Sequence, residues 1–210
     1  MTTLSPRRRW SPAGQALHWL SAALILFMLG LGLVMVEFVE DPGRRFELYQ
    51  LHKTCGAFVF LLLALRTAWR LFAVAPSPPA TMPGHERLLS RTVHVVLYLM
   101  ILAITLSGYV MISSSPLPLP VELPGGLAVP NLIAPDYGLS ETMKTLHHRL
   151  AWVLLGLVAL HVLAALKHHF WDRDDVLRQM LPLVRARREG RSPVDRPPGG
   201  GLPAAERGDR

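Results

Sequence analysis

Long stretches without charged side chains constrain this chain more than any other feature of its 210 residues. No Asp, Glu, Lys or Arg occurs between Arg9 and Glu37, between Arg91 and Glu122, or between Arg149 and Lys167. Each stretch is close to or longer than the roughly 20 residues that a helix needs to cross the hydrocarbon core of a bilayer. Half of all residues are hydrophobic and they gather in these blocks, so the sequence predicts a membrane protein rather than a soluble domain.

A fourth apolar stretch runs from about residue 48 to residue 72 and is interrupted by Lys53, Arg66 and Arg70. These charges lie near the two ends of the stretch, where long basic side chains reach the membrane interface, so we interpret it as a further spanning helix. The predicted fold is an all-α membrane protein, a bundle of four transmembrane helices. The helices are expected at about 13–36, 47–72, 88–113 and 144–170.

Basic residues in the short connections predict the orientation, because they are retained on the cytoplasmic side during insertion. They precede the first helix, lie at the connection from the second helix to the third, and close or follow the fourth, whereas residues 114–143 contain none. We therefore expect both termini to be cytoplasmic and the protein to lie in the bacterial inner membrane. The net charge of +7 is mostly this topology signal, so it does not indicate nucleic-acid binding.

Shorter segments flank and connect the helices. Residues 1–12 are expected to be a cytoplasmic segment that precedes the membrane domain, which we place at 13–185. The connection 114–143 holds six prolines and apolar runs such as PNLIAP, and we expect it to fold as a cap over the periplasmic helix ends. Residues 186–210 are rich in Gly, Pro and charge and cannot form a core, which predicts a disordered cytoplasmic tail.

The histidines can be placed by their depth in the membrane. His18 lies about five residues into the first helix from the cytoplasmic side, and His52 about five residues into the second from the periplasmic side. His147 lies near the periplasmic start of the fourth helix, and His161, fourteen residues on, is about 21 Å deeper at 1.5 Å per residue. Fourteen steps of 100° return to within about 40° of the starting direction, so one helix face presents both rings. The matched depths pair His52 with His147 and His18 with His161.

Two imidazoles that face each other across a helix bundle supply the two axial nitrogens of a six-coordinate b-type haem, since the porphyrin supplies the other four. One buried histidine alone is more simply a satisfied core residue, but polar side chains inside a bilayer are costly and tend to be functional. Zinc fits less well, because neither level clearly offers a cysteine or carboxylate to complete a tetrahedral site. The sequence therefore predicts two haem b groups stacked across the membrane as an electron path.

Several segments carry a resemblance to a known family. They are ALHWL (16–20), LHKTCG (51–56), ALRTAWRL (64–71), HVVLYL (94–99), LHHRLAW (146–152) and LHVLAALKHHFWDRDDVLRQMLP (160–182). From about residue 10 to residue 182 the chain resembles the bacterial cytochrome b561 family. The resemblance implies a four-helix membrane bundle with two haems b, and the axial ligands carry over onto His18, His52, His147 and His161.

Other residues are candidates for contacts with haem or quinone. Arg66 and Arg70 lie four apart near the inner side and could pair with haem propionates or anchor the helix at the interface. His94 has no partner at its depth and is a candidate for a propionate contact or for helix packing. His168 lies seven residues beyond His161 at the cytoplasmic boundary. The resemblance places His168 in a quinone pocket, where a histidine can relay protons, and the alternative is an interfacial residue without such a role.

A basic cluster is expected around the outer haem. It consists of Arg44, Arg45, Lys53, Lys144 and Arg149. Such a cluster would attract an anion and raise its encounter rate, or it would contact phospholipid headgroups.

Three functions remain open from the sequence. The family resemblance implies an oxidoreductase of the superoxide:quinone type, which oxidises superoxide and reduces ubiquinone from the membrane quinone pool. The second function is an electron-transfer subunit that serves a periplasmic redox protein or dehydrogenase docked on the capping loop. The third is a non-catalytic protein that binds or senses haem.

Overall fold

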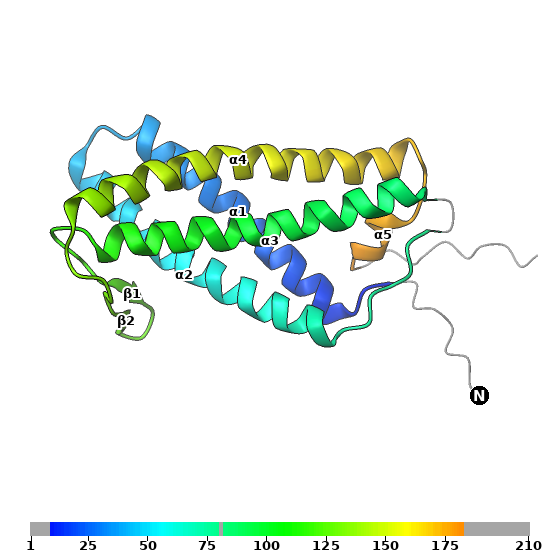
Figure 1. Cartoon of the computed structure of the whole chain (residues 1–210), viewed down its shortest axis with the longest axis horizontal. Coiled ribbons are helices and arrows are strands. Elements are labelled where there is room, and N and C mark those ends of the chain that lie inside the picture. The colour runs from blue at the N-terminus through cyan, green and yellow to red at the C-terminus, as the bar shows by residue number, and fades with distance from the viewer. Residues whose placement is uncertain (1–8, 80–81, 183–210) are drawn as a thin grey trace, which may run out of the picture.

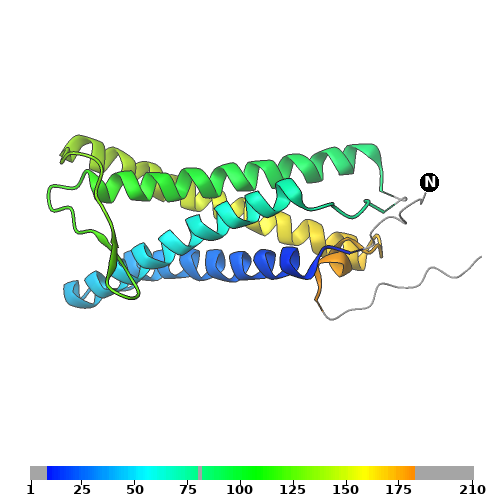
Figure 2. The same ribbon diagram turned by 90° about the horizontal axis from the view of Figure 1, so that it is seen from below.

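The computed structural model describes residues 9–79 and 82–182 of the chain. Four long helices dominate it: α1 (Pro12–Glu37), α2 (Pro42–Phe72), α3 (Gly84–Ser113) and α4 (Tyr137–Phe170). They lie side by side, α1 packing mainly on α2 and α3 mainly on α4 (Figures 1 and 2). All four are long and apolar enough to cross a membrane, so the expected fold, a helical bundle with four membrane-spanning helices, is confirmed.

Three helices begin at least four residues earlier than the sequence analysis placed them. α3 starts at Gly84 rather than at 88, and the other two are α2 and α4, whose starts have side-chain caps. α2 starts at Pro42 rather than at 47, because the Asp41 carboxylate accepts a hydrogen bond from Arg44 N at 2.7 Å. α4 starts at Tyr137 rather than at 144, because Asp136 accepts a hydrogen bond from Leu139 N at 3.0 Å. Such caps satisfy N–H groups that the first helical turn leaves unpaired. Hydropathy marks where the apolar part of a helix begins, and these two helices extend beyond it.

The helices are longer than a bilayer requires. They contain 26, 31, 30 and 34 residues, which is roughly 39 to 51 Å at 1.5 Å per residue. The hydrocarbon core of a bilayer is only about 30 Å thick. Side chains near the helix ends therefore lie in or beyond the interfacial layers, where charged groups are accessible to water.

The connection from α3 to α4 carries a small antiparallel hairpin made of β1 (Val121–Leu123) and β2 (Leu127–Val129). Its turn contains Gly125 and Gly126 with φ of 85° and 76°, a conformation that favours glycine. We call the end of the bundle that carries this hairpin the hairpin end. The opposite end, where α1 starts and α4 finishes, is the termini end (Figure 1).

Hydrogen bonds fix this connection to the bundle. Thr54 of α2 donates to Glu122 O at 2.7 Å, so the hairpin rests on the flank of α2. Tyr109 of α3 donates to Pro130 O at 2.9 Å. The segment is therefore an ordered part of the fold at the hairpin end.

A short helix, α5 (Val176–Met180), follows α4 and folds back towards the start of α1 at the termini end (Figure 1). Two side chains of α1 hold it there: Gln15 Nε2 donates to Gln179 O at 3.0 Å, and Trp19 Nε1 donates to Met180 O at 2.8 Å. The expected disordered tail at 186–210 and most of the expected segment 1–12 lie outside the described residues.

Candidate functional site

α2 and α4 bring His52 and His147 opposite each other towards the hairpin end. The ring centroids are 6.2 Å apart and the ring planes meet at 77°. Nδ1 of His147 lies 2.9 Å from Ile104 O and 3.2 Å from Ser107 Oγ, both on α3. A hydrogen on Nδ1 that is donated to the carbonyl leaves Nε2 without one, so Nε2 is available as a ligand to a metal ion.

Gly108 lets α3 approach this ring closely. A Cβ at position 108 would lie 3.1 Å from Cε1 and 3.2 Å from Nδ1 of His147. Carbon atoms at an optimal separation lie about 3.5–4.0 Å apart, so any larger residue would press on the imidazole. The orientation of His147 therefore depends on glycine at this position.

A second histidine pair lies nearer the termini end, where His18 of α1 faces His161 of α4. Their ring centroids are 6.4 Å apart and the ring planes meet at 76°. His94 of α3 lies beside this pair, with its ring centroid 5.3 Å from that of His161, and its Nδ1 donates to Ser90 O at 2.6 Å. The expectation that His94 has no partner at its depth is therefore wrong, because α3 packs closely on α4 and places His94 against His161.

The spacing of the two facing pairs would let one metal ion lie between the two rings of each pair. Metal–nitrogen bonds of about 2.0–2.1 Å on each side of the ion would hold the two nitrogens roughly 4 Å apart, and the ring centroids would lie farther apart than the nitrogens. The observed separations are 6.2 and 6.4 Å. His94 and His161, at 5.3 Å, are too close for the same arrangement, so His94 does not replace His18 in the pair.

Two unpartnered nitrogen atoms lie at the same two levels. Within the described residues, four buried side-chain nitrogens have no hydrogen-bond partner: Nδ1 of His18, His52 and His169, and Nε of Arg9. His18 and His52 belong to the two facing pairs. A buried polar atom without a partner is costly and calls for an explanation such as a bound group. The donor set at both levels consists of imidazole nitrogens, which suit haem iron. The residues present therefore fit two axially coordinated haems.

The two arginines of α2 lie in different surroundings. Arg66 is half-buried, and its guanidinium lies 5.4 Å from the centroid of the Tyr98 ring. Arg70 is exposed and its guanidinium stacks on the ring of Trp10 at 4.6 Å. Arg66 stays a candidate for a haem propionate contact, whereas Arg70 is engaged with Trp10, which precedes α1.

The expected basic cluster lies at the hairpin end, and some of its charges are already engaged. Arg44 and Arg45 lie in the first turn of α2, which the sequence analysis had expected to begin at about 47. The guanidinium of Arg45 donates to Val39 O. Lys144 forms an ion pair with Glu141 at 3.3 Å.

Two further members of the cluster each follow one histidine of the pair in sequence, Lys53 after His52 and Arg149 two residues after His147. Lys53 Nζ lies 3.4 Å from the carbonyl oxygens of Leu119 and Pro120, and Arg149 is exposed. His148, next to the paired His147, is also exposed and accepts a hydrogen bond from Trp152 Nε1 at 3.2 Å. Lys53 is therefore the basic side chain that joins α2, beside His52, to the connection that carries the hairpin.

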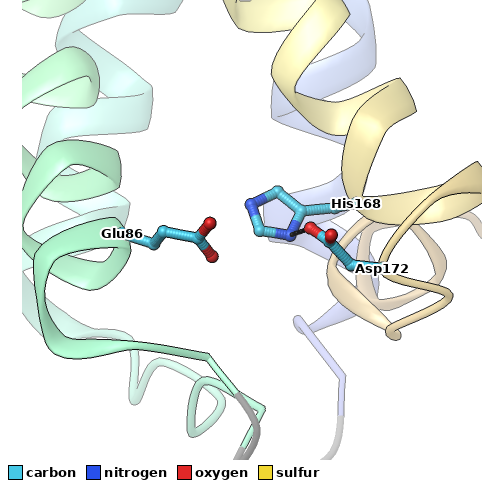
Figure 3. A group of neighbouring side chains, drawn as sticks. All are labelled: Glu86, His168 and Asp172. Atoms are coloured by element: carbon cyan, nitrogen blue, oxygen red, sulfur yellow. Dashed lines mark ion pairs between the residues drawn. The ribbon is translucent and has the colours of Figure 1, made fainter.

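His168 lies in a cluster of charged side chains at the termini end (Figure 3). Its Nδ1 is 2.8 Å from Asp174 Oδ2 and 3.0 Å from Asp172 Oδ2. The neighbouring Lys167 Nζ is 2.8 Å from both Asp172 Oδ2 and Glu86 Oε1. The cluster thus ties the end of α4 to the start of α3 and to the turn that follows α4.

Three of these groups have the spacing of a metal site. Ligand atoms of Glu86, His168 and Asp172 lie within 4.8 Å of one another. The ammonium group of Lys167 already contacts both carboxylates, however, and supplies the positive charge that they require. We therefore interpret the cluster as a network of ion pairs and hydrogen bonds.

The sequence analysis selected His168 but missed the carboxylates around it. Glu86 lies eighty-two positions before His168 in the sequence, and only the packing of α3 against α4 joins them. Asp172 and Asp174 come close because the chain turns back at Arg173, which has a φ of 54°. The run WDRDD offered a local signal, since several carboxylates follow the helix end directly.

The comparisons of this chain with known proteins agree on one family. The sequence model of a family described as prokaryotic cytochrome b561 matches residues 9–183. A protein named cytochrome b561 homolog 2, from Escherichia coli (strain K12), is 34% identical over 181 residues, which cover 86% of this chain and 95% of that protein. A Yersinia pestis protein named probable superoxide oxidase CybB is 25% identical over 187 residues, covering 85% and 98%. Cytochrome b561 homolog 1 of Escherichia coli (strain K12) is 24% identical over 174 residues, covering 83% and 97%.

Proposed function

The chain belongs to the prokaryotic cytochrome b561 family of haem b membrane proteins that transfer electrons, and we propose from this premise that it conducts electrons across the membrane through two haems. The observation that carries the proposal is the pair of histidine levels. His147 and His161 lie on the same helix and each faces a histidine of another helix, at centroid separations of 6.2 and 6.4 Å. Two such levels on one helix form a path for electrons through the bundle.

Each level would hold one haem b through two axial nitrogens. His52 and His147 would bind the haem towards the hairpin end, and His18 and His161 the haem towards the termini end. Haem, when bound, supplies one-electron redox chemistry. The protein contributes the fixed orientation of the ligands, for example through the contacts of His147 Nδ1 with Ile104 O and Ser107 Oγ, because such partners set the tautomer and the basicity of a ligating imidazole.

For the reaction itself, we infer oxidation of superoxide at the hairpin end and reduction of ubiquinone at the termini end. Two superoxide anions, one ubiquinone and two protons would give two molecules of dioxygen and one ubiquinol. The name of the Yersinia pestis relative, probable superoxide oxidase, supports this choice. The basic side chains at the hairpin end also favour an anionic donor, because charges of one sign concentrate the opposite ion.

The same proposal assigns the two sides of the membrane. The hairpin end would be periplasmic and the termini end cytoplasmic, with the protein in the inner membrane. The support is the distribution of basic residues, which are absent from the whole connection 114–143 and frequent around the two termini.

An electron donor that is itself a protein is the second candidate. The connection at the hairpin end exposes large apolar side chains, among them Leu117, Leu127 and Leu132, whose surfaces are 82%, 67% and 77% accessible. Exposed apolar groups of this kind favour the docking of another protein. In that case the chain would serve as an electron-transfer subunit for a periplasmic redox protein.

A purified sample separates these possibilities. We expect the protein in detergent to contain two haems b per chain by the pyridine haemochrome assay, and to form ubiquinol from ubiquinone when superoxide is supplied. His147→Gln should lose one haem, whereas the control His148→Gln, which changes the exposed neighbour, should keep both. Two haems that superoxide leaves oxidised would favour a protein donor, and fewer than two haems in the unmodified protein would contradict the paired-histidine proposal.

A further inference from the structure

The β-hairpin of the connection between α3 and α4 lies against the side of α2 (Figures 1 and 2). Thr54 Oγ1 donates to Glu122 O at 2.7 Å, and Lys53 Nζ lies 3.4 Å from Leu119 O. Thr54 is twelve residues beyond Pro42, the first residue of α2, which is about 18 Å along the helix at 1.5 Å per residue. The hairpin is therefore set well back from the start of α2.

The charged residues of α2 and α4 place this level at the edge of the hydrocarbon. On α2, Lys53 is followed by no charged residue until Arg66, and on α4, Arg149 is followed by none until Lys167. Long basic side chains in membrane helices lie where their charged ends can reach the interface. Lys53 and Arg149 thus mark the boundary between the interfacial layer and the hydrocarbon at the hairpin end, and the hairpin lies beside Lys53 at that boundary.

The face of α2 that contacts the hairpin continues along the helix as an apolar stripe. Phe58, Leu61 and Leu65 follow Thr54 at steps of four, three and four residues, so they share one face of the helix. The surfaces of these three side chains are 39%, 51% and 49% accessible. Exposed apolar side chains on a membrane-spanning helix face the acyl chains of the lipid. The hairpin is therefore continuous with a surface that α2 presents to lipid.

The two faces of the hairpin differ in polarity, because alternate residues of a strand point to opposite faces. The apolar face consists of two cross-strand pairs, Val121 with Val129 and Leu123 with Leu127. The opposite face carries Glu122 and Ala128, both of which are exposed. Val121 is only 6% accessible, whereas Leu127, next to the turn, is 67% accessible. The apolar face is thus covered at one end of the hairpin and open at the turn.

We propose that the hairpin lies in the interfacial layer of the membrane, where the side chains of Leu123 and Leu127 contact phospholipid acyl chains and Glu122 faces water. Residues 116–135 contain no charged residue other than Glu122, and apolar surface that leaves water gains roughly 25 cal/mol per Å². The paired strands also satisfy backbone groups that contact with lipid would otherwise leave unpaired. Leu127 would then be unavailable for the docking of a protein donor. This placement depends on the membrane-spanning helices and not on haem, so it can fail separately from the proposed function.

The reactivity of single cysteines in lipid vesicles tests this placement. Cys55 is the only cysteine of the chain, so Cys55→Ala gives a background without a thiol. In that background, Leu127→Cys reports on the open end of the apolar face, Ala128→Cys on the opposite face of the hairpin, and Glu40→Cys on the connection between α1 and α2. The haem-loaded variants are reconstituted into phosphatidylcholine vesicles and treated with a maleimide that carries polyethylene glycol.

We expect Leu127→Cys to react about tenfold or more slowly than the two control variants, because the thiolate is the reacting form and apolar surroundings raise the pKa of a thiol. All three variants should react at the same rate after denaturation in dodecyl sulfate. A rate for Leu127→Cys in vesicles that equals the rates of Ala128→Cys and Glu40→Cys overturns the proposal, and it would leave this face open for a protein partner.

A fluorescent dye separates contact with lipid from burial against the protein. A nitrobenzoxadiazole dye attached to the Leu127→Cys variant should lose more emission in brominated phosphatidylcholine than the same dye on Glu40→Cys. Bromine near the glycerol end of the acyl chain should quench more than bromine near the methyl end, and the comparison with unbrominated vesicles removes the constant quenching by haem. The absence of quenching by either lipid overturns the proposal. If Leu127→Cys does not insert into vesicles, Leu123→Cys, on the same face, decides by the same two measurements.

Discussion

The contact between Gly108 and His147 leads to a sharp prediction about the haem towards the hairpin end. In the variant Gly108→Ala the new Cβ would lie 3.1 Å from Cε1 and 3.2 Å from Nδ1 of His147. Contacts this short are tighter than almost all those that real Cβ atoms make, so the ring must move by a few tenths of an ångström. Metal–ligand distances tolerate only about 0.2 Å, so we expect the His147 nitrogen to leave its coordinating position.

The expected result is a fall in haem content from two towards one per chain, with the remaining haem at the His18 level. Loss of folding should not accompany it, because alanine is favoured over glycine in a helix by about 0.8–1.0 kcal/mol. Pyridine haemochrome assay and low-temperature absorption spectra of the purified variant measure both effects. Gly84→Ala is the matched control, since it lies on the same helix and a Cβ there meets nothing within 4 Å. Two haems with unchanged spectra in Gly108→Ala would refute the assignment of His147 as a ligand held by this contact.

Three further predictions concern other contacts. His94→Phe should keep two haems per chain whereas His18→Phe should lose one, because only the ring of His18 lies far enough from that of His161 for a metal ion between them. The pyridine haemochrome assay counts the haems, and the loss of a haem in His94→Phe would contradict the assignment of His18 as the ligand. Lys53→Gln should slow haem reduction by superoxide severalfold at low ionic strength and have little effect near 1 M salt, where charges are screened beyond about 3 Å. Stopped-flow absorbance measures the rate of haem reduction, and a difference between the two proteins that does not depend on salt would exclude electrostatic attraction. Arg173→Gly should stabilise the protein by about 1 kcal/mol, because a left-handed backbone conformation costs residues other than glycine about 1–2 kcal/mol. The temperature at which haem absorbance is lost measures this stability, and a lower midpoint in the variant would speak against strain at this turn.

The regular geometry of helices explains what could be predicted from the sequence. Rise and rotation per residue are constant along a helix, so the fourteen-residue spacing of His147 and His161 is enough to fix their relative depth and their shared face. The structure indeed brings His52 to the first ring and His18 to the second. Whether these rings bind haem iron stays a proposal.

Packing between helices explains what could not be predicted. His94 lies against His161 because of the way α3 packs on α4, and the spacing of residues within α3 does not predict this contact. Asp174 reaches His168 through a left-handed turn at an arginine, although glycine is the residue that usually signals such a turn. The helix starts at Pro42 and Tyr137 were readable from the preceding aspartates, but hydropathy alone placed them too late.

The presence of one histidine from each pair on α4 has a consequence for how two haems at the proposed levels would be adjusted. Any sliding or rotation of α4 as a rigid body displaces His147 and His161 together. A change on this helix would therefore act on both haems at once. Independent adjustment would have to come from the other helices, since α1 carries His18 and α2 carries His52. Substitutions that separate the two haem potentials are therefore expected on α1 and α2 rather than on α4.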